Sequence, residues 1–153
     1  MKDIFINFNN SRYSIYDRPL PTADDEIKAL TKQFSVSALF FAVFLLNKII
    51  GYVRFHEDGE KYDMGYCFHS SYQAKGYAYE SSKALIEYFS QTYGITQFSA
   101  GTAMDNIPSC KLLKKLSFTC ISTEMVSFDG RFSFRGGVFC LNLRNANGEL
   151  AEK

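Results

Sequence analysis

The sequence predicts a single α+β domain in which helices flank a mixed, mostly antiparallel sheet. Three observations lead to this class. Three β-rich runs separated by short polar turns follow one another at 38–68, helical and strand patterns alternate over 69–118, and two more β-rich runs close the chain. The 153 residues, 46% hydrophobic and 22% charged, suit one globular domain and exclude wholesale disorder.

The first 37 residues predict a short strand and a helix. Apolar and polar residues alternate over 4–8, which indicates the strand. Thr22 precedes three acidic residues and is therefore expected to cap a helix over 23–34, because acidic side chains favour the positive end of a helix dipole.

The next stretch, 38–68, predicts a three-stranded antiparallel meander. Its strands are expected at 38–46, 49–56 and 62–68, joined by a turn at Asn47-Lys48 and a second polar turn at 57–60.

The remaining pattern predicts two helices and three strands. In the first helix, at 76–93, apolar and small residues recur every three or four positions, and Gly94 suits the position after the helix end. The second helix starts at Asn106, with Pro108 in its first turn. The other elements are strands at 95–102, 119–128 and 134–143, a turn at 129–131 between the last two, and a polar tail at 145–153.

Composition limits the classes of partner and compartment. The chain has 17 basic and 16 acidic residues, so electrostatics give no argument for binding nucleic acid or an anionic membrane. The longest apolar run, 38–46, is well short of the roughly 20 residues of a membrane-spanning helix, and the N-terminus lacks a signal-peptide pattern. The four cysteines form no metal-binding spacing with each other or with the two histidines. We therefore expect free thiols, no metal, and a cytoplasmic protein.

The segment Gln73-Ala74-Lys75-Gly76-Tyr77-Ala78, between a strand and a helix, is the first candidate site. Unpaired backbone N–H groups at a helix N-terminus can hold a phosphate. Gly76 allows close approach of the backbone, and the small side chains of Ala74 and Ala78 keep the approach clear. Taken alone, the string is a weak signal and favours an ordinary strand-to-helix turn.

Four linked motifs narrow the interpretation. They are Asp63-Met64-Gly65-Tyr66-Cys67-Phe68, then Gln73 to Glu80, then Asn106-Ile107-Pro108-Ser109, then Leu113-Lys114-Lys115-Leu116-Ser117-Phe118. In this order and spacing, over about residues 38–120, the chain resembles the GNAT acyltransferases. The similarity is greatest to the branch of ribosomal-protein N-terminal acetyltransferases, whose pattern runs E-[IV]-G-Y, Q/W-G-K-G-Y-A-x-E, N-x-x-S and L-x-K-L-G-F.

The resemblance implies a GNAT-like sheet splayed between its fourth and fifth strands, here 61–68 and 95–102, with acetyl-CoA as co-substrate in the gap. It divides the chain into a reduced N-terminal part (1–37), in which 4–8 is a vestigial first strand, the meander (38–68), a CoA-binding core (69–118), a C-terminal hairpin (119–144) and a tail (145–153). The pyrophosphate is expected on the N–H groups of 74–78. The implied cofactor-binding residues are Tyr66, Cys67, Phe68, Gln73, Ala74, Lys75, Gly76, Tyr77, Ala78 and Asn106.

The resemblance also implies an N-acetyltransferase of the EC 2.3.1 class that transfers acetyl directly to a primary amine within a ternary complex. The amine must lose a proton and the leaving thiolate must gain one. Asp63 stands where the family has a glutamate base but is one methylene shorter, so it acts as base, only orients the substrate, or lies in solvent. Ser109 matches the acid, although a serine there can also cap a helix.

The acceptor stays open, as a protein N-terminus or a small amine. The short stretch before residue 38 suggests that some of the helices that wall the acceptor site are missing. A catalytically weak acyl-CoA-binding module is therefore the alternative function. An exposed sheet edge would also allow a homodimer, because a second copy can cover unpaired backbone groups.

Overall fold

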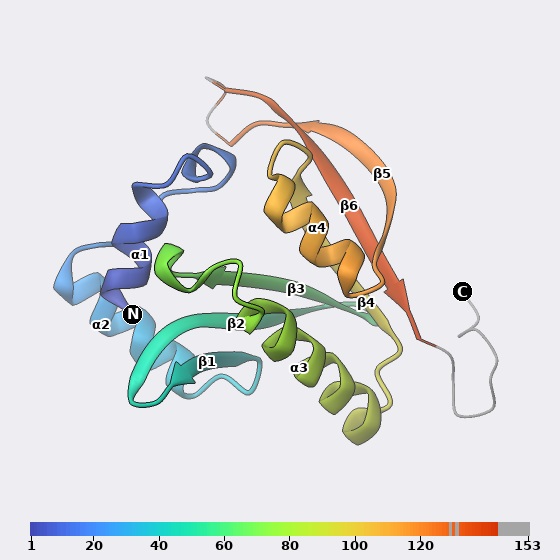
Figure 1. Ribbon diagram of the computed structural model, residues 1–153, viewed down its shortest axis with the longest axis horizontal. Coiled ribbons are helices and arrows are strands. Elements are labelled where there is room, and N and C mark those ends of the chain that lie inside the picture. Colours follow the sequence, from blue (N-terminus) through green and yellow to red (C-terminus); the bar gives the residue numbers. More distant parts are fainter. Residues whose placement is uncertain (129, 131, 144–153) are drawn as a thin grey trace.

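The computed structural model describes residues 1–128, 130 and 132–143, which form four α-helices, two short 3₁₀ turns and six strands (Figure 1). The helical elements are α1 (Lys2–Asn9), η1 (Ser14–Tyr16), α2 (Asp24–Ser35), η2 (Ser70–Tyr72), α3 (Tyr77–Tyr93) and α4 (Ile107–Lys115). The strands are β1 (Phe40–Leu45), β2 (Lys48–Asp58), β3 (Lys61–Phe68), β4 (Gln97–Ala103), β5 (Thr119–Val126) and β6 (Phe134–Asn142). Asp129, Arg131 and the predicted tail at 145–153 lie outside this description.

The strands form one sheet in the order β1-β2-β3-β4-β6-β5. Neighbouring strands are antiparallel except β3 and β4, which are parallel. The predicted α+β class with a mixed, mostly antiparallel sheet is therefore confirmed. Every helix and strand predicted after residue 37 is present, with ends shifted by a few residues.

The N-terminal segment differs from the prediction. Residues 4–8 lie in helix α1, where Ile4 and Phe5 are 2% and 1% exposed while Ile6 is 38% exposed. Burial of two consecutive residues fits one face of a helix and not the alternating faces of a strand. The apolar alternation at 4, 6 and 8 was therefore misleading.

Helix α2 begins without the predicted cap. Ala23 occupies the N-cap position with no side-chain hydrogen bond, so Thr22 does not cap the helix. Three acidic residues in the first turn favour the helix start instead, since they lie at the positive end of its dipole. One of them, Asp24, also pairs with Lys2 of α1 at 2.5 Å. Two helices and a 3₁₀ turn thus precede β1. The expectation that helices are missing from this segment is therefore wrong, and the predicted strand at 4–8 is absent from it.

The first hairpin turns one residue earlier than predicted. Leu45 pairs with Lys48, so the turn is Leu46-Asn47 and Lys48 already belongs to β2. Leu46 is 92% exposed with φ of 54°, a conformation that an apolar residue rarely adopts. Pattern reasoning therefore counted Leu46 with the strand.

Two apolar clusters cover the two faces of the sheet. Helices α3 and α4 pack on one face, where Val53 and Phe139 belong to the main core. Helices α1 and α2 pack on the other face against Tyr52 and Cys67. Side chains of consecutive strand residues point to opposite faces, which is why Tyr52 and Val53 belong to different clusters. The molecule is thus a helix–sheet–helix sandwich (Figure 1).

The sheet opens between β3 and β4. These strands pair only at Tyr62 with Phe98 and at Asp63 with Ser99, whereas β3 pairs with β2, and β4 with β6, along nearly their whole lengths. Beyond Asp63 the facing edges of β3 and β4 carry no ladder hydrogen bonds to each other. The predicted splay is confirmed; it lies between the third and fourth strands because no strand precedes β1. Within the described part of the chain, no helix is both long and apolar enough to cross a membrane.

Candidate functional site

The loop at 74–78 presents unpaired backbone donors. Ala74 and Gly76 have φ of 57° and 91°, and Gly76 is the N-cap of the 17-residue helix α3. The N–H groups of 74–78 donate no hydrogen bond to any other described residue. A Cβ added at Gly76 would meet no atom within 4 Å, so the space above the loop is open. Free amides at the positive end of a helix dipole fit a diphosphate.

The side chains of this loop have structural roles. Gln73 donates through Nε2 to the carbonyl oxygen of Phe68 at 2.8 Å, which ties the loop to the end of β3. Lys75 is exposed with its Nζ 5.8 Å from the ring of Tyr72, and Tyr77 lies against the same ring. The half-buried Ala78 packs on the main core. The backbone amides of this segment and the exposed side chain of Lys75 are left to meet a ligand.

Ala74 adopts the left-handed conformation where the motif carries glycine. An L-residue with a Cβ costs roughly 1–2 kcal/mol in that region. The loop therefore keeps its shape despite the substitution, at some expense in stability.

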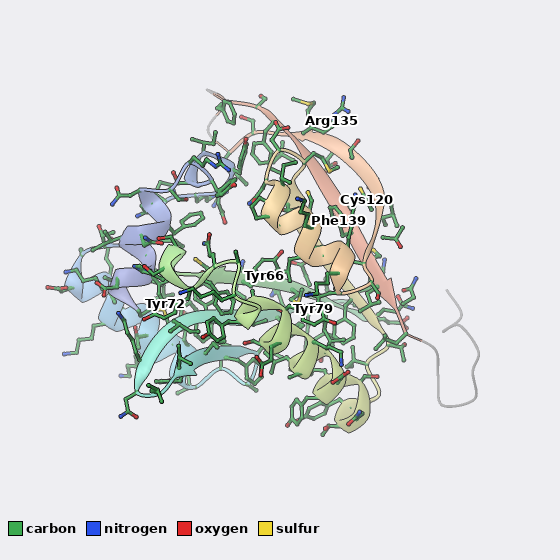
Figure 2. All side chains as sticks on the ribbon, viewed as in Figure 1. Tyr66, Tyr72, Tyr79, Cys120, Arg135 and Phe139 are labelled. Atoms are coloured by element: carbon green, nitrogen blue, oxygen red, sulfur yellow. The ribbon has the colours of Figure 1, made fainter. Side chains whose placement is uncertain are left out.

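Tyr66 on β3, labelled in Figure 2, contacts Ser109 on α4 over the open part of the splay. The Tyr66 hydroxyl lies 2.8 Å from the Ser109 Oγ and donates toward the Ser109 carbonyl at 3.4 Å. Burial raises the pKa of Tyr66 to about 12, so the phenol stays protonated at neutral pH. The Ser109 hydroxyl is therefore hydrogen-bonded to a neutral phenol, and either oxygen can be the donor.

Asn106 positions Ser109 from the start of α4. The Asn106 side chain accepts a hydrogen bond from the Ser109 N–H at 3.4 Å and is the N-cap. Ser109 is consequently not the capping residue, and its hydroxyl contacts Tyr66 instead of the helix backbone. Both residues lie where the sequence predicted, but the contact of Ser109 with the Tyr66 side chain was not anticipated. Strand alternation, which places 64, 66 and 68 on one face, was the available signal.

Asp63 lies at the apex of the splay, in the last residue pair that joins β3 to β4. The hydroxyl of its partner Ser99 donates to Asp63 Oδ1 at 3.0 Å. Burial raises the pKa of the Asp63 carboxyl, and the hydrogen bond from Ser99 partly opposes that increase. A half-buried carboxylate with a raised pKa suits proton abstraction.

The two candidate proton-transfer groups, Asp63 and Ser109, lie on opposite sides of the sheet. Positions 63 and 66 differ by an odd number, so Asp63 points away from the face on which Tyr66 contacts Ser109. A group lying in the splay can therefore be reached from both sides.

The cysteines near the splay are poor nucleophiles. Cys67 packs in the α1/α2 cluster, and burial raises its thiol pKa to about 12. Burial likewise raises the pKa of Cys110, whose thiol donates to the carbonyl of Ala103 at 3.6 Å. Nucleophilic cysteines need a lowered pKa. In residues 1–128, 130 and 132–143, no three His, Cys, Asp or Glu side chains are grouped to hold a metal ion.

A cavity of about 270 Å³ on the α1/α2 side of the splay was not predicted. It is formed by the loop after α1, the open end of β4 and the β5–β6 hairpin. These segments are far apart in the sequence, and none carries a recognisable motif. The lining residues are Tyr16, Asp17, Gly101, Thr102, Ala103, Glu124, Val126, Phe128, Phe134, Gly136, Gly137 and Val138.

The splayed sheet and the amide-lined loop define a class of protein. A model of the acetyltransferase (GNAT) domain matches residues 2–119, more than half of the chain. The protein belongs to the GNAT acetyltransferase family.

Individual relatives agree with this assignment. YnaD, an uncharacterized N-acetyltransferase of Bacillus subtilis (strain 168), is 32% identical over 99 residues, which are 62% of this chain and 58% of YnaD. The match thus spans less than two thirds of that relative. A GNAT-family acetyltransferase from Bacillus anthracis has a TM-score of 0.79 at 22% identity, covering 92% of this chain and 87% of that one. RimL, a ribosomal L7/L12 α-N-protein acetyltransferase solved with coenzyme A, has a TM-score of 0.79 at 14% identity, covering 93% and 86%. The two solved structures share the fold.

Proposed function

We propose that the protein transfers acetyl from acetyl-CoA to a primary amine by direct transfer within a ternary complex. The observation that supports this proposal most directly is the open sheet between β3 and β4, with free amides at 74–78 beside it and the Tyr66–Ser109 pair over it. Acetyl-CoA-dependent acetylation is the general chemistry of the family to which the chain belongs. The residue roles, the acceptor and the direct mechanism are the proposed part.

The backbone would bind the co-substrate. The amides of 74–78 would receive the diphosphate, and the unpaired edge of Tyr66, Cys67 and Phe68 would pair with the amide groups of the pantetheine arm. Asn106 would add a contact beside the arm while still capping α4. When bound, acetyl-CoA supplies the acetyl group as an activated thioester.

Asp63 and Ser109 would move the protons. The neutral amine nitrogen would attack the thioester carbonyl and form the N–C bond. Asp63, held in orientation by Ser99, would accept, directly or through water, the proton that the nitrogen loses as it becomes an amide. The C–S bond breaks as the Ser109 hydroxyl gives its proton to the leaving sulfur. The Tyr66 phenol, 2.8 Å from Ser109 Oγ, is placed to relay a replacement proton from solvent to Ser109, while Asp63 releases its proton to solvent. The products are an amide and free CoA thiol.

The Ser109→Ala variant tests this assignment. A general acid contributes about 10²–10⁴-fold, so kcat should fall at least about 100-fold. The affinity for CoA, measured by titration calorimetry, should change less than threefold, because the loop at 74–78 is untouched. Tyr66→Phe keeps the buried ring and should also lower kcat. A Ser109→Ala enzyme with wild-type kcat would remove Ser109 from the mechanism.

An amine panel separates the enzyme from the alternative of a catalytically weak acyl-CoA-binding module. Both functions predict binding of acetyl-CoA, but only the enzyme releases thiol when an amine is added. Binding without thiol release for any small amine or peptide would favour the module, for which the shorter carboxylate of Asp63 is the supporting observation.

The proposal also includes the branch of the family, the cellular compartment and the oligomeric state. The motif order and the fold shared with RimL support a place in the ribosomal-protein N-terminal acetyltransferase branch. The cysteines Cys67, Cys110, Cys120 and Cys140 are free, which supports a reducing, cytoplasmic setting. The sheet ends in β1 and β5, the edges at which a second copy would form the proposed homodimer.

A further inference from the structure

The cavity described above opens onto the splay from the α1/α2 side. Gly101, Thr102 and Ala103 line it, and all three lie on β4 beyond the last residue pair with β3. Asp17, in the loop after α1, also lines it. The cavity therefore borders the open part of β4, on the face of the sheet that carries Asp63.

The charged residues that line the cavity are acidic. Asp17 and Glu124 are carboxylates, and no lysine or arginine lines it among residues 1–128, 130 and 132–143. Arg18 is a nearby cation, with its guanidinium carbon 5.9 Å from the centre of the Phe128 ring, which lines the cavity. A ligand ammonium would be attracted by the two carboxylates, whereas a carboxylate on the ligand would be repelled.

Aromatic rings form the other side of the cavity. The Tyr16 ring packs 5.2 Å from Phe134, and the Phe128 ring lies 5.8 Å from Phe134. Figure 1 shows that the loop after α1 lies beside the end of the β5–β6 hairpin, which brings these rings together. Ring faces bind both apolar groups and cations, so an amine attached to an aromatic or apolar group gains from each part.

The size of the cavity limits the acceptor. A volume of about 270 Å³ is slightly below the roughly 300–1,000 Å³ of pockets for drug-sized ligands. A Cβ added at Gly101 would meet no atom within 4 Å, so empty space lies directly above the strand. The cavity therefore suits one aromatic group with its short amine arm.

We propose that the acceptor is a primary amine joined by a short arm to an aromatic group, with no carboxylate next to the amine. This inference rests on the proposed function and specifies its substrate class. A free arylalkylamine and the N-terminal aromatic residue of a peptide share this chemistry. The volume favours the free amine.

The substrate test compares matched amines, with thiol release from acetyl-CoA as the readout. We expect kcat/KM for 2-phenylethylamine to exceed the values for phenylalanine and for butylamine at least tenfold. The first comparison isolates the carboxylate and the second isolates the ring. Phenylalanine amide and the amidated peptide Phe-Ala-Ala distinguish a free amine from a peptide source. Equal rates for phenylalanine, or for butylamine, would overturn the proposal.

Three variants test the cavity itself. Asp17→Asn and Glu124→Gln should each raise KM for 2-phenylethylamine about tenfold and reduce the discrimination against phenylalanine. Gly101→Leu should raise KM by filling the open space. Glu60→Gln, in the exposed β2–β3 turn, is the matched control and should leave KM unchanged. Wild-type KM in the three cavity variants would place the acceptor elsewhere.

CoA titration, together with the amine panel, distinguishes failure of the acceptor inference from failure of the proposed function. If the wild type binds CoA and acetylates other amines in preference to aromatic ones, the acceptor inference is wrong and the proposed function stands. If no amine or peptide causes thiol release, both are wrong.

Discussion

At the scale of single residues, Asp63 shows how environment can compensate for a shorter side chain. Its carboxyl group lies at the point where β3 and β4 part, and Ser99, its partner in the last residue pair, donates a hydrogen bond to it. Burial raises the Asp63 pKa, and the Ser99 bond holds the carboxylate in one orientation. If Asp63 is the base, as proposed, this fixed placement would offset the loss of one methylene.

The pH profile of kcat/KM should depend on Ser99. If Asp63 is the base, the rate falls as pH drops through its pKa, because the protonated carboxyl cannot accept a proton. The Ser99 hydroxyl favours the carboxylate, so Ser99→Ala should raise that pKa and move the acid limb of the profile to higher pH. The rate on the high-pH plateau should also fall, because the carboxylate loses the hydrogen bond that orients it. Ser122→Ala, on the exposed part of β5, should leave the profile in place. An unshifted acid limb in Ser99→Ala would assign that limb to another group.

At the scale of elements, helix α3 contains a buried, unpaired hydroxyl group that lowers the stability of the protein. The hydroxyl of Ser82 is fully buried and has no hydrogen-bond partner among the described residues. Its neighbour Ser81 instead donates to the Tyr77 carbonyl at 2.8 Å. A buried, unpaired polar group costs about 1–3 kcal/mol, and serine is a poorer helix former than alanine.

Ser82→Ala should therefore stabilise the protein. We expect the free energy of unfolding to increase by about 1 kcal/mol, measured by urea denaturation, because the unpaired hydroxyl is removed and helix propensity improves. The adjacent Ser81→Ala change loses a satisfied hydrogen bond and should be close to neutral. A destabilised Ser82→Ala protein would mean that the hydroxyl has a partner, such as an ordered water, in solution.

The elements also show which structural features were predictable. The strands and helices after residue 37 have strong hydrophobic periods, so their type and order followed from the sequence. Helix α1 did not, because apolar residues at 4, 6 and 8 imitate a strand while burial selects Ile4 and Phe5. Local periodicity carries no information about which neighbour an element will pack against.

The candidate site divides in the same way. The loop at 73–78 and the start of α4 are contiguous motifs, so the sequence predicted that each precedes or opens a helix. The contacts of Tyr66 with Ser109 and of Ser99 with Asp63 join residues 43 and 36 positions apart. The cavity beside β4 combines Asp17, Gly101 and Glu124, none of which is distinctive alone. Such sites exist only after folding has brought distant segments together.

At the scale of the whole molecule, the splay divides the sheet into a β1-β2-β3 part and a β4-β6-β5 part that pair through only two residue pairs. The facing edges beyond Asp63 lack ladder partners. A ligand that pairs with one edge and anchors on α3 would bridge the two parts and bind only the folded state. Ligand binding of that kind stabilises a protein in proportion to the logarithm of ligand concentration.

Acetyl-CoA should therefore raise the melting temperature. At about 100 times Kd the gain is about 2.7 kcal/mol. At about 2–4 °C per kcal/mol for a chain of this size, the shift is about 5–10 °C by differential scanning fluorimetry. Gly76→Glu should remove most of the shift, because it adds a side chain and a negative charge beside the free amides of 74–78.

The matched control for Gly76→Glu is Gly59→Glu. Gly59, in the β2–β3 turn, also has a positive φ (61°) and open space around its Cβ position, so it has the same backbone strain but lies outside the loop at 74–78. Both variants should melt below the wild type without ligand, since a β-carbon is unfavourable at positive φ. With acetyl-CoA, Gly59→Glu should recover the full shift and Gly76→Glu should not. Equal shifts in the two variants would show that the diphosphate binds elsewhere, because only one of them alters the amide loop.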